Sequence, residues 1–235
     1  MIWGDRLILW SHRGFPGIEN SLSAFNQACS EEITHFETDL HATKDGVLIL
    51  SHDPTLIRLN RSDGQISELT LKELQRFPIH NIEPWCTLDQ LVASHPDVII
   101  SLDMKAQETL NPLISWMRGR DTSNFIVGSF SHKRVQAFRK SHPQIRTALT
   151  TREVLLIKFG LARFVRATSF SPKFAIVPAK FKTVTIVTPR FIHACERKNI
   201  QVHVWTVNSV SEVLHLKTLG VTGVVTDNYR ILRGV

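Results

Sequence analysis

The chain has 235 residues, of which 43% are hydrophobic and 21% charged, and 28 Lys and Arg against 21 Asp and Glu give a formal net charge of +7. This is the balance of a globular protein, and it excludes collagen, low-complexity scaffolds and intrinsic disorder. A single α/β barrel commonly has about 250 residues, so the length fits one domain of that kind.

The predicted elements alternate along the chain: short β-branched runs are separated by segments of helical periodicity. The predicted strands are residues 7–10, 36–40 with 47–50, 98–102, 125–128, 146–149, 164–168, 202–205 and 223–226. The predicted helices are residues 22–29, 71–77, 88–93, 110–117, 135–140, 154–159, 191–197 and 210–219. Eight strand positions alternating with helices are typical of a (β/α)8 TIM barrel. An open doubly wound sheet is the competitor, but its G-x-G-x-x-G fingerprint is absent.

Helix ends are signalled at three places. Ser209 with Glu212 three residues later forms a capping box pattern, and Thr188 before Pro189 puts proline at the first helical position. Gly220 follows the last predicted helix and is typical of a C-cap.

The chain shows no internal repeat and no linker, so we expect a single domain over residues 1–235. Residues 51–85 are longer than a normal βα connection, and we interpret them as a small excursion after the second strand.

The three cysteines, Cys29, Cys86 and Cys195, lie far apart and form no C-x-x-C pair. Their odd number argues against a disulfide framework or a thiolate zinc site and favours a reducing compartment. No apolar run approaches the roughly 20 residues that cross a bilayer, and the start of the chain has no secretory apolar segment. We therefore expect a cytoplasmic protein without a transmembrane segment.

Polar residues gather where the predicted strands end, which is where barrels place their chemistry. These residues are His12 and Arg13 after the first strand, Glu37 and Asp39 on the second with His52 and Asp53 beyond it, Asp103 and Lys105 on the third, and Trp205 on the seventh.

Carboxylates in this set share one face. Glu37 and Asp39 are two apart in a strand, so their side chains point the same way, and Asp103 and Lys105 repeat the spacing. Converging carboxylates repel unless a cation neutralises them, and hard oxygen ligands suit Mg²⁺ or Ca²⁺. The alternative is that Glu37 and Asp39 point outwards and pair with surface cations. The neighbouring Asp103 and Lys105 favour one divalent cation.

Two of the 11 histidines stand out, because His12 and His52 each follow a strand. Arg13 offers a planar fork of donors for phosphate, and Asp53 could fix the tautomer of His52. Two imidazoles beside a hard cation are what phosphodiester cleavage needs, since one takes a proton from the nucleophile and the other gives one to the leaving alkoxide.

The motifs together resemble those of the glycerophosphodiester phosphodiesterases. The similar segments are SHRGFPGIENSLSAF (residues 11–25), FETDLHATKDGVLILSHDPTLIR (36–58), SLDMK (101–105) and VHVWTVN (202–208). Several spaced motifs in the right order over nearly the whole chain are highly specific.

The resemblance implies a fold, a reaction and a set of roles. The fold is the TIM barrel, and the reaction is metal-dependent hydrolysis of a small-molecule glycerophosphodiester to glycerol 3-phosphate and an alcohol, through attack by the substrate's own 2-hydroxyl. The implied roles are general acid and base for His12 and His52, metal ligands for Glu37, Asp39, Asp103 and, as a further candidate, Glu19, phosphate binding for Arg13 and Lys105, and a pocket wall for Trp205.

Some positions depart from the family pattern. Ile18 stands where proline is usual and Ser21 where threonine is common, and both substitutions should be tolerated. Asp103 replaces the commoner glutamate and is one methylene shorter, so the metal could sit differently.

Three other functions stay open. The first is a phosphate-binding module without turnover, and the second is a lysophospholipid-type phosphodiesterase with an apolar channel built by the excursion. The third is nucleic-acid binding, since residues 133–166 are locally basic. We expect no nucleic-acid partner, because the basic residues are scattered and no basic groove rich in aromatic residues is visible, and we interpret this stretch as a solvated surface.

Overall fold

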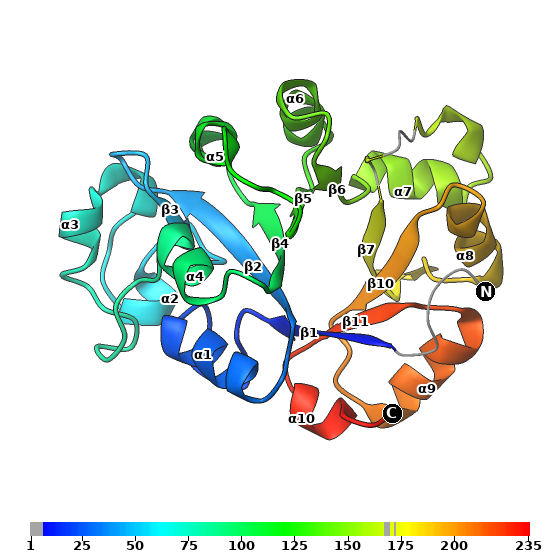
Figure 1. The fold of residues 1–235 in the computed structure, drawn as a ribbon, viewed down its shortest axis with the longest axis horizontal. Helices are drawn as coiled ribbons and strands as arrows, with labels where there is room; N and C mark the ends of the chain where they lie inside the picture. Colours follow the sequence, from blue (N-terminus) through cyan, green and yellow to red (C-terminus); the bar gives the residue numbers. More distant parts are fainter. Residues whose placement is uncertain (1–6, 167–169, 172) are drawn as a thin grey trace. The chain divides into compact units, whose positions relative to one another are not determined.

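A computed structural model describes residues 7–166, 170–171 and 173–235 of the chain. The chain divides into two compact units, one formed by Arg13–Phe125 and the other by the chain up to His12 together with Ile126–Val235. We call them the 13–125 unit and the 126–235 unit, and each is described by itself (Figure 1).

The 13–125 unit is built on three strands. β2 (His35–Ala42) is central: β4 (Ile99–Met104) pairs with it in parallel and β3 (Leu48–Leu50) pairs with it antiparallel. The parallel register sets Glu37 opposite Ser101 and Asp39 opposite Asp103. The α-helices of this unit are α1 (Leu22–Ser30), α2 (Ile57–Asn60), α3 (Leu71–Leu74), α4 (Leu88–Ser94) and α5 (Leu110–Met117), with short 3₁₀ turns η1 (Ile66–Glu68) and η2 (Gln107–Thr109).

The predicted excursion after the second strand lies between β3 and α4 and holds α2, η1 and α3 (Figure 1). It folds around its own apolar cluster, which includes Leu56, Leu59, Ile66 and Trp85. Trp85 is fully buried and donates its indole N–H to the carbonyl of Phe77 over 2.7 Å. The segment is therefore an ordered substructure rather than a loose loop.

Parallel strands also form the framework of the 126–235 unit. These are β1 (Ile8–His12), β5 (Phe125–Gly128), β6 (Arg146–Thr147), β7 (Phe174–Pro178), β10 (Gln201–Trp205) and β11 (Gly223–Thr226). β5 pairs with β6, a bridge joins Ala148 to Phe174, and β7, β10, β11 and β1 follow in that order.

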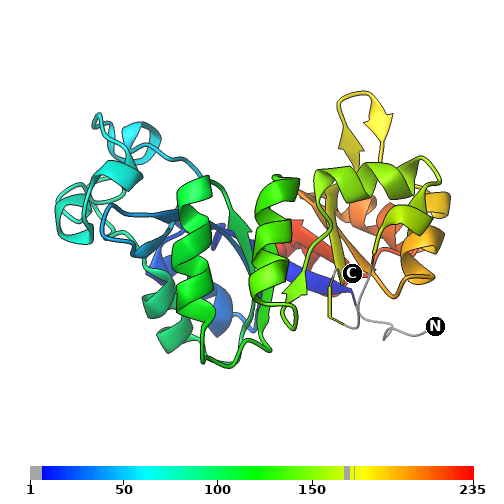
Figure 2. The ribbon, with the colours of Figure 1, turned by 90° about the horizontal axis from the view of Figure 1, so that it is seen from above.

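The helices of this unit cover its strands from outside, as Figure 1 shows for α8 and α9. They are α6 (His132–Ser141), α7 (Thr151–Lys158), α8 (Pro189–Glu196), α9 (Val210–Leu219) and α10 (Tyr229–Leu232), with the 3₁₀ turn η3 (Ala162–Phe164). A small hairpin of β8 (Lys180–Phe181) and β9 (Val184–Thr185) projects from the unit's body (Figure 2).

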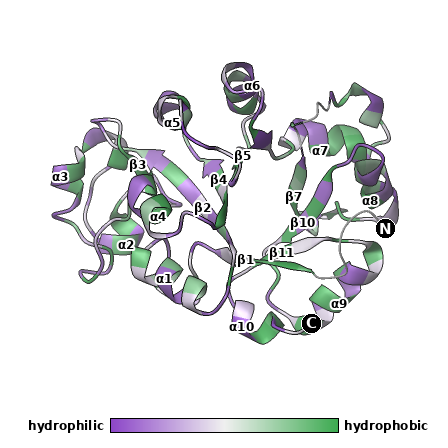
Figure 3. Cartoon of the chain, viewed as in Figure 1, coloured by the Kyte–Doolittle hydropathy of each residue, from purple (hydrophilic) through white to green (hydrophobic). Residues whose placement is uncertain are grey.

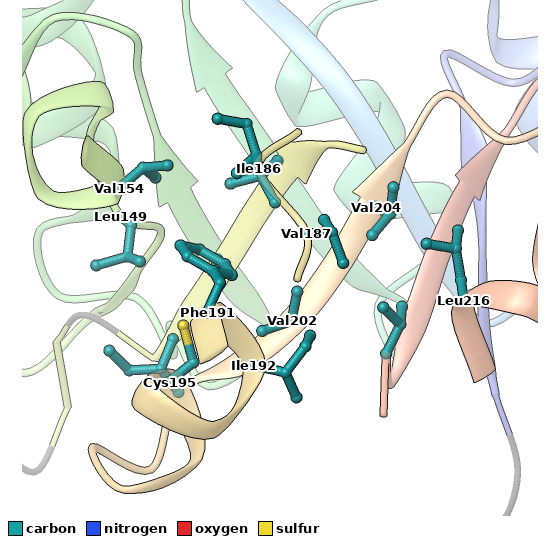
Figure 4. Packing of buried hydrophobic residues seen from close by; sticks show 14 of the residues in the cluster. Leu149, Val154, Ile186, Val187, Phe191, Ile192, Cys195, Val202, Val204 and Leu216 are labelled. Carbon is teal, nitrogen blue, oxygen red and sulfur yellow. The ribbon is translucent and has the colours of Figure 1, made fainter. Parts of the chain in front are cut away.

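The core of the 126–235 unit lies between these helices and the strands (Figure 4). Phe191 and Cys195 of α8 pack with Val202 and Val204 of β10, and all four side chains are buried. Burying one such large side chain contributes about 1.5–3 kcal/mol. Figure 3 shows hydrophobic residues on the strands of this unit, interrupted by hydrophilic ones on β10, and mixed colours on the helices.

Most predicted elements are present with ends shifted by one to three residues, and α5, α9, β5 and β11 have the predicted bounds. Thr188 and Ser209 accept hydrogen bonds as N-caps, Pro189 is the first residue of α8, and Gly220 is a left-handed C-cap with φ of +93°.

One predicted strand, residues 164–168, is wrong. Phe164 ends η3, residues 165 and 166 form no strand, and residues 167 and 168 lie outside the described residues. The strand that follows β6 in the framework is β7, and it begins ten residues after the start of the predicted strand. Its sequence FAIVP carries the β-branched signal, but Pro178 at its end weakened that signal.

Among the described residues, no helix is both long and apolar enough to span a bilayer.

Candidate active site

The loop after the first strand is shaped by close backbone packing in the 13–125 unit. A Cβ on Gly14 or Gly17 would come within 2.8 or 2.7 Å of the Ala24 methyl on α1, so only glycine fits at either position. Ser21 then caps α1 by accepting a hydrogen bond from the N–H of Ala24 over 3.2 Å. The serine departure is therefore tolerated. Ile18 packs against the excursion's cluster, so the loop keeps an apolar contact where proline was usual.

Carboxylates of β2 and β4 face one side of the strand pair, as their spacing predicted. Asp39 and Asp103 are register partners, and Lys105 Nζ lies 2.7 Å from Oδ1 of Asp39 and 3.0 Å from Oδ2 of Asp103. Burial alone would lower the pKa of Lys105, but the charges of Asp103 and Asp39 raise it above its ordinary value. The ammonium group is therefore a permanent cation between two acids.

Arg13 is a second cation in this cluster. Its Nε lies 2.7 Å from Oδ2 of Asp39, and its Nη1 donates to Oε2 of Glu19 over 3.3 Å. The contact with Asp39 is an ion pair without hydrogen-bond alignment, since neither Arg13 Nε nor Asp39 Oδ2 completes a hydrogen bond. Oδ2 of Asp39, whose side chain is only 2% exposed, therefore has no hydrogen bond.

Glu37 lies two residues before Asp39 on the same face of β2. Burial raises the pKa of its carboxyl well above the usual range, and the charges of Asp39 and Asp103 add to this, against the opposing charges of Arg13 and Lys105. The Glu37 carboxyl is therefore much harder to ionise than a carboxyl in water.

The excursion supplies His52 and the residues that hold it. Nδ1 of His52 lies 2.6 Å from Oδ1 of Asp53, whose other oxygen accepts a hydrogen bond from Nε of Arg58. Burial alone would raise the pKa of Asp53, but the hydrogen bonds from Arg58 and His52 hold it below its ordinary value. Asp53 therefore stays ionised and orients the imidazole.

Further contacts of Arg58 and His41 stabilise the positions of Asp53 and His52. Arg58 also donates to Oε1 of Glu19, which is 5% exposed, and this hydrogen bond raises the pKa of Arg58. His41 of β2 has an imidazole nitrogen 3.3 Å from the carbonyl of His52, and burial lowers its pKa.

In the 126–235 unit, His12 at the end of β1 has a carboxylate partner of its own. Its Nδ1 lies 2.5 Å from Oδ1 of Asp227, directly after β11. Asn208 holds that aspartate on both sides: its Nδ2 donates to Asp227 Oδ2 over 2.8 Å, and its Oδ1 accepts from the Asp227 backbone N–H over 2.9 Å. The imidazole of His12 is therefore fixed in orientation.

Trp205 ends β10 in the same unit. Its indole N–H donates to the carbonyl of Ile176 over 3.2 Å, and Phe130 meets its ring edge-on with centroids 6.1 Å apart. The two rings form an apolar surface at the end of β10, and the role of Trp205 as a pocket wall stays a prediction.

A divalent cation is implied by the motifs, and the residues fit one by their chemistry. Within the described part of the chain, no three His, Cys, Asp or Glu side chains are arranged as they stand to hold a metal ion. The cluster nevertheless has five carboxylates, those of Glu19, Glu37, Asp39, Asp53 and Asp103, against the three cations Arg13, Arg58 and Lys105. Fully ionised, it carries two uncompensated negative charges, and Asp39 Oδ2 has no hydrogen bond.

The predicted site residues thus fall in two groups. Arg13, Glu19, Glu37, Asp39, His52, Asp103 and Lys105 all lie in the 13–125 unit, while His12 and Trp205 lie in the 126–235 unit.

Four residues that the sequence reasoning missed are Arg58, Phe130, Asn208 and Asp227. The position of Asp227, directly after the last strand, was the signal that could have found it. Arg58 lies in α2 of the excursion, away from the predicted strand ends, so the strand-end argument could not find it.

Comparison with known proteins gives a consistent picture. A model of the glycerophosphoryl diester phosphodiesterase family matches residues 12–230. A Mycobacterium tuberculosis protein named probable glycerophosphodiester phosphodiesterase 2 is 27% identical over 241 residues, covering 99% of this chain and 91% of that protein.

Solved structures share the fold. A glycerophosphoryl diester phosphodiesterase domain from Mycobacterium tuberculosis superposes with a TM-score of 0.80 at 17% identity, covering 95% of this chain and 97% of that one. An Oleispira antarctica phosphodiesterase in complex with the product sn-glycerol-3-phosphate superposes with a TM-score of 0.72 at 18% identity, covering 93% and 92%. The fold class is therefore the predicted (β/α)8 TIM barrel.

Proposed function

The chain belongs to the glycerophosphoryl diester phosphodiesterase family, and we propose that it hydrolyses glycerophosphodiesters to glycerol 3-phosphate and an alcohol. The observation that carries this proposal is the pair of carboxylate-bound histidines. Nδ1 of His12 contacts Asp227 at 2.5 Å and Nδ1 of His52 contacts Asp53 at 2.6 Å. Two such dyads are the general acid and base that a phosphodiester cleavage requires.

In the first step, one histidine takes the proton of the substrate's 2-hydroxyl group. The hydroxyl oxygen forms a bond to phosphorus, the bond between phosphorus and the alcohol oxygen breaks, and the other histidine gives its proton to the leaving oxygen. The product is a cyclic phosphate. In the second step the histidines exchange roles, and water opens the ring to give glycerol 3-phosphate. A carboxylate on each Nδ1 stabilises the imidazolium formed in either step, so Nε2 carries the proton exchange.

Arg13 and Lys105 are proposed to bind the phosphate oxygens. The planar guanidinium of Arg13 suits two oxygens at once, whereas Lys105 offers a single strong charge. Both are held by Asp39, so they are positioned before substrate binds.

We propose that Glu37, Asp39 and Asp103, with Glu19 as a further candidate, hold one Mg²⁺ or Ca²⁺. When bound, the cation would supply Lewis-acid stabilisation of the charge on the phosphoryl oxygens. The shorter Asp103 leaves more room than glutamate would.

The location we propose is the cytoplasm. Three cysteines without a disulfide, of which Cys86 and Cys195 are buried, suit a reducing compartment.

A substrate panel tests the proposed function. The purified chain, stripped with chelator and refilled with Mg²⁺, Ca²⁺ or Mn²⁺, is incubated with glycerophosphocholine, glycerophosphoethanolamine and lysophosphatidylcholine, and products are followed by ³¹P NMR. Glycerol 3-phosphate should form from the first two. Faster release of lysophosphatidic acid would favour the lysophospholipid-type activity, and no product with any cation would favour a binding module.

A further inference from the structure

The charge of this chain is concentrated in one stretch. Residues 122–195 contain thirteen of the 28 Lys and Arg residues but a single one of the 21 Asp and Glu residues, Glu153. The rest of the chain is therefore net acidic, although the whole carries +7. All of this stretch except residues 122–125 belongs to the 126–235 unit, so the excess positive charge of the chain lies in that unit.

The single acid of the stretch is already neutralised. Glu153 is 5% exposed and binds Arg139 through two hydrogen bonds of 2.5 and 3.1 Å. Arg139 also donates to Thr147 Oγ1 and to the carbonyl of Ala148, so all three of its nitrogens are engaged. This pair is structural, and it fixes α6 against α7.

A groove of about 920 Å³ lies beside this pair, lined by residues of α6, α7 and η3 and by Arg166 and Ser171. We call it the α6–α7 groove. Besides Arg139, four cations line it: Lys140, Arg152, Arg163 and Arg166. Within the described part of the chain, no ion pair joins any of these four to a carboxylate. Their charges are therefore available to an anion from outside.

Exposed apolar side chains lie on α7 and in the residues that follow it, up to Phe164. Phe159 is 67% exposed and Phe164 58%, and Leu155 and Leu161 are also exposed. The guanidinium of Arg163 lies over the Phe164 ring at 4.8 Å, so charge and aromatic surface are adjacent. Every exposed phenylalanine among the described residues lies between residues 130 and 181.

We propose that the α6–α7 groove and the exposed apolar residues that follow α7 form a docking surface for a membrane rich in anionic phospholipid. Cations attract the negatively charged headgroups, and phenylalanine and leucine side chains enter the boundary between headgroups and acyl chains. The exposed leucines favour a bilayer over nucleic acid, because an aliphatic side chain has no face on which a base could stack. Glycerophosphodiesters are what remains of phospholipids after both acyl chains are removed, so docking would hold the proposed activity where its substrate arises.

Vesicle co-sedimentation tests the proposal on the full chain. Vesicles of 70% phosphatidylcholine with 30% phosphatidylglycerol are compared with vesicles of pure phosphatidylcholine at 0.1 and 0.5 M NaCl. We expect binding to the anionic vesicles at low salt, loss of most of it at high salt, and little binding to the neutral vesicles.

Two double variants separate charge from apolar contact. Arg163→Gln with Arg166→Gln, and Phe159→Ser with Phe164→Ser, should each weaken partitioning at least about tenfold. The matched control on α9, Leu214→Ser with Lys217→Gln, removes an exposed leucine and an exposed lysine elsewhere in the same unit and should bind as wild type. All variants should retain the wild-type circular dichroism and hydrolyse dissolved glycerophosphocholine at the wild-type rate, which keeps this test independent of the proposed function.

Three results would overturn the proposal: no binding to anionic vesicles, an equal loss of binding in the α9 control, or wild-type binding by both the arginine and the phenylalanine double variants. Tight binding of a fluorescent 20-base-pair DNA duplex without vesicle binding would assign the surface to nucleic acid instead.

Discussion

His12 and Asp227 lie at opposite ends of the chain, 215 residues apart, and their side chains meet with Nδ1 2.5 Å from Oδ1. The contact exists because β1 and β11 are parallel neighbours, with Ser11 in register with Thr226. Strand pairing thus delivers a histidine and its carboxylate at the same strand ends. Asn208 then locks the aspartate with two hydrogen bonds.

Asp227→Asn should lower kcat by about 10²-fold or more. The amide keeps the size of the side chain but cannot stabilise an imidazolium, and it can present N–H to Nδ1 and favour the wrong tautomer. The measurement is glycerophosphocholine hydrolysis across pH, with Asp97→Asn, an exposed carboxylate, as the control. Activity of Asp227→Asn within threefold of wild type would show that Asp227 does not serve His12.

Local signals in the sequence predicted much of this arrangement. The two-residue spacing of Glu37 and Asp39 placed both on one face of a strand, and the structure has them there beside Asp103. The count of strands and helices predicted the barrel class, and the cap signals at Thr188, Ser209 and Gly220 fixed helix ends.

Long-range partners could not be predicted in the same way. Arg58 meets Glu19 across 39 residues, because an irregular excursion folds back on the loop after β1, and no periodicity encodes such a return. The strand predicted at residues 164–168 failed for a related reason. Phe164, Val165 and Arg166 have a strand-like composition, yet Phe164 and Arg166 are exposed and belong to the basic, apolar segment after α7.

A divalent cation should stabilise the folded protein. A bound cation offsets the excess of carboxylates over cations in the cluster, and a ligand at 100 times its Kd stabilises the folded protein by about 2.7 kcal/mol. Melting temperature is measured after chelator stripping and after adding Mg²⁺ or Ca²⁺. Glu37→Gln with Asp39→Asn should abolish the rise, whereas Asp63→Asn, which removes an exposed carboxylate, should keep it. An equal rise in the double variant would show that the cation binds elsewhere.

Cys86 and Cys195 should resist thiol reagents in the native protein. Burial raises the pKa of each thiol from 9.0 to about 12. At pH 8 only about one thiol in ten thousand is then ionised, and the thiolate is the reactive form. Mass spectrometry after iodoacetamide treatment should find these two cysteines alkylated only in guanidinium, while the partly exposed Cys29 reacts in the native state.

The same shifts predict a loss of stability in alkaline solution. The unfolded chain releases these protons near pH 9 and the folded chain only near pH 12, so the free energy of unfolding should fall as pH rises between these values. In the alkylation experiment, rapid reaction of Cys86 with iodoacetamide in the native protein at pH 8 would contradict its burial.

Arg139→Met should destabilise the 126–235 unit by about 3 kcal/mol, because it leaves Glu153 buried without its cation. Adding Glu153→Gln should recover part of the loss, since the amide is neutral and can still cap α7. Denaturant unfolding of both single variants and the double variant measures the coupling. If Arg139→Met alone were neutral, the pair would not be what joins α6 to α7.

The most direct test of the proposed function is the rate of glycerol 3-phosphate release from glycerophosphocholine by His12→Ala, His52→Ala and the double variant, with His215→Ala on the surface of α9 as control. Because an acid and a base act as a unit, each single variant should lose about 10²-fold or more, and the double variant should lose little beyond the worse single. The control should keep full activity. If His52→Ala lowered the melting temperature yet stayed within a few-fold of the wild-type rate, His52 would only hold its loop, and the acid–base account would be contradicted.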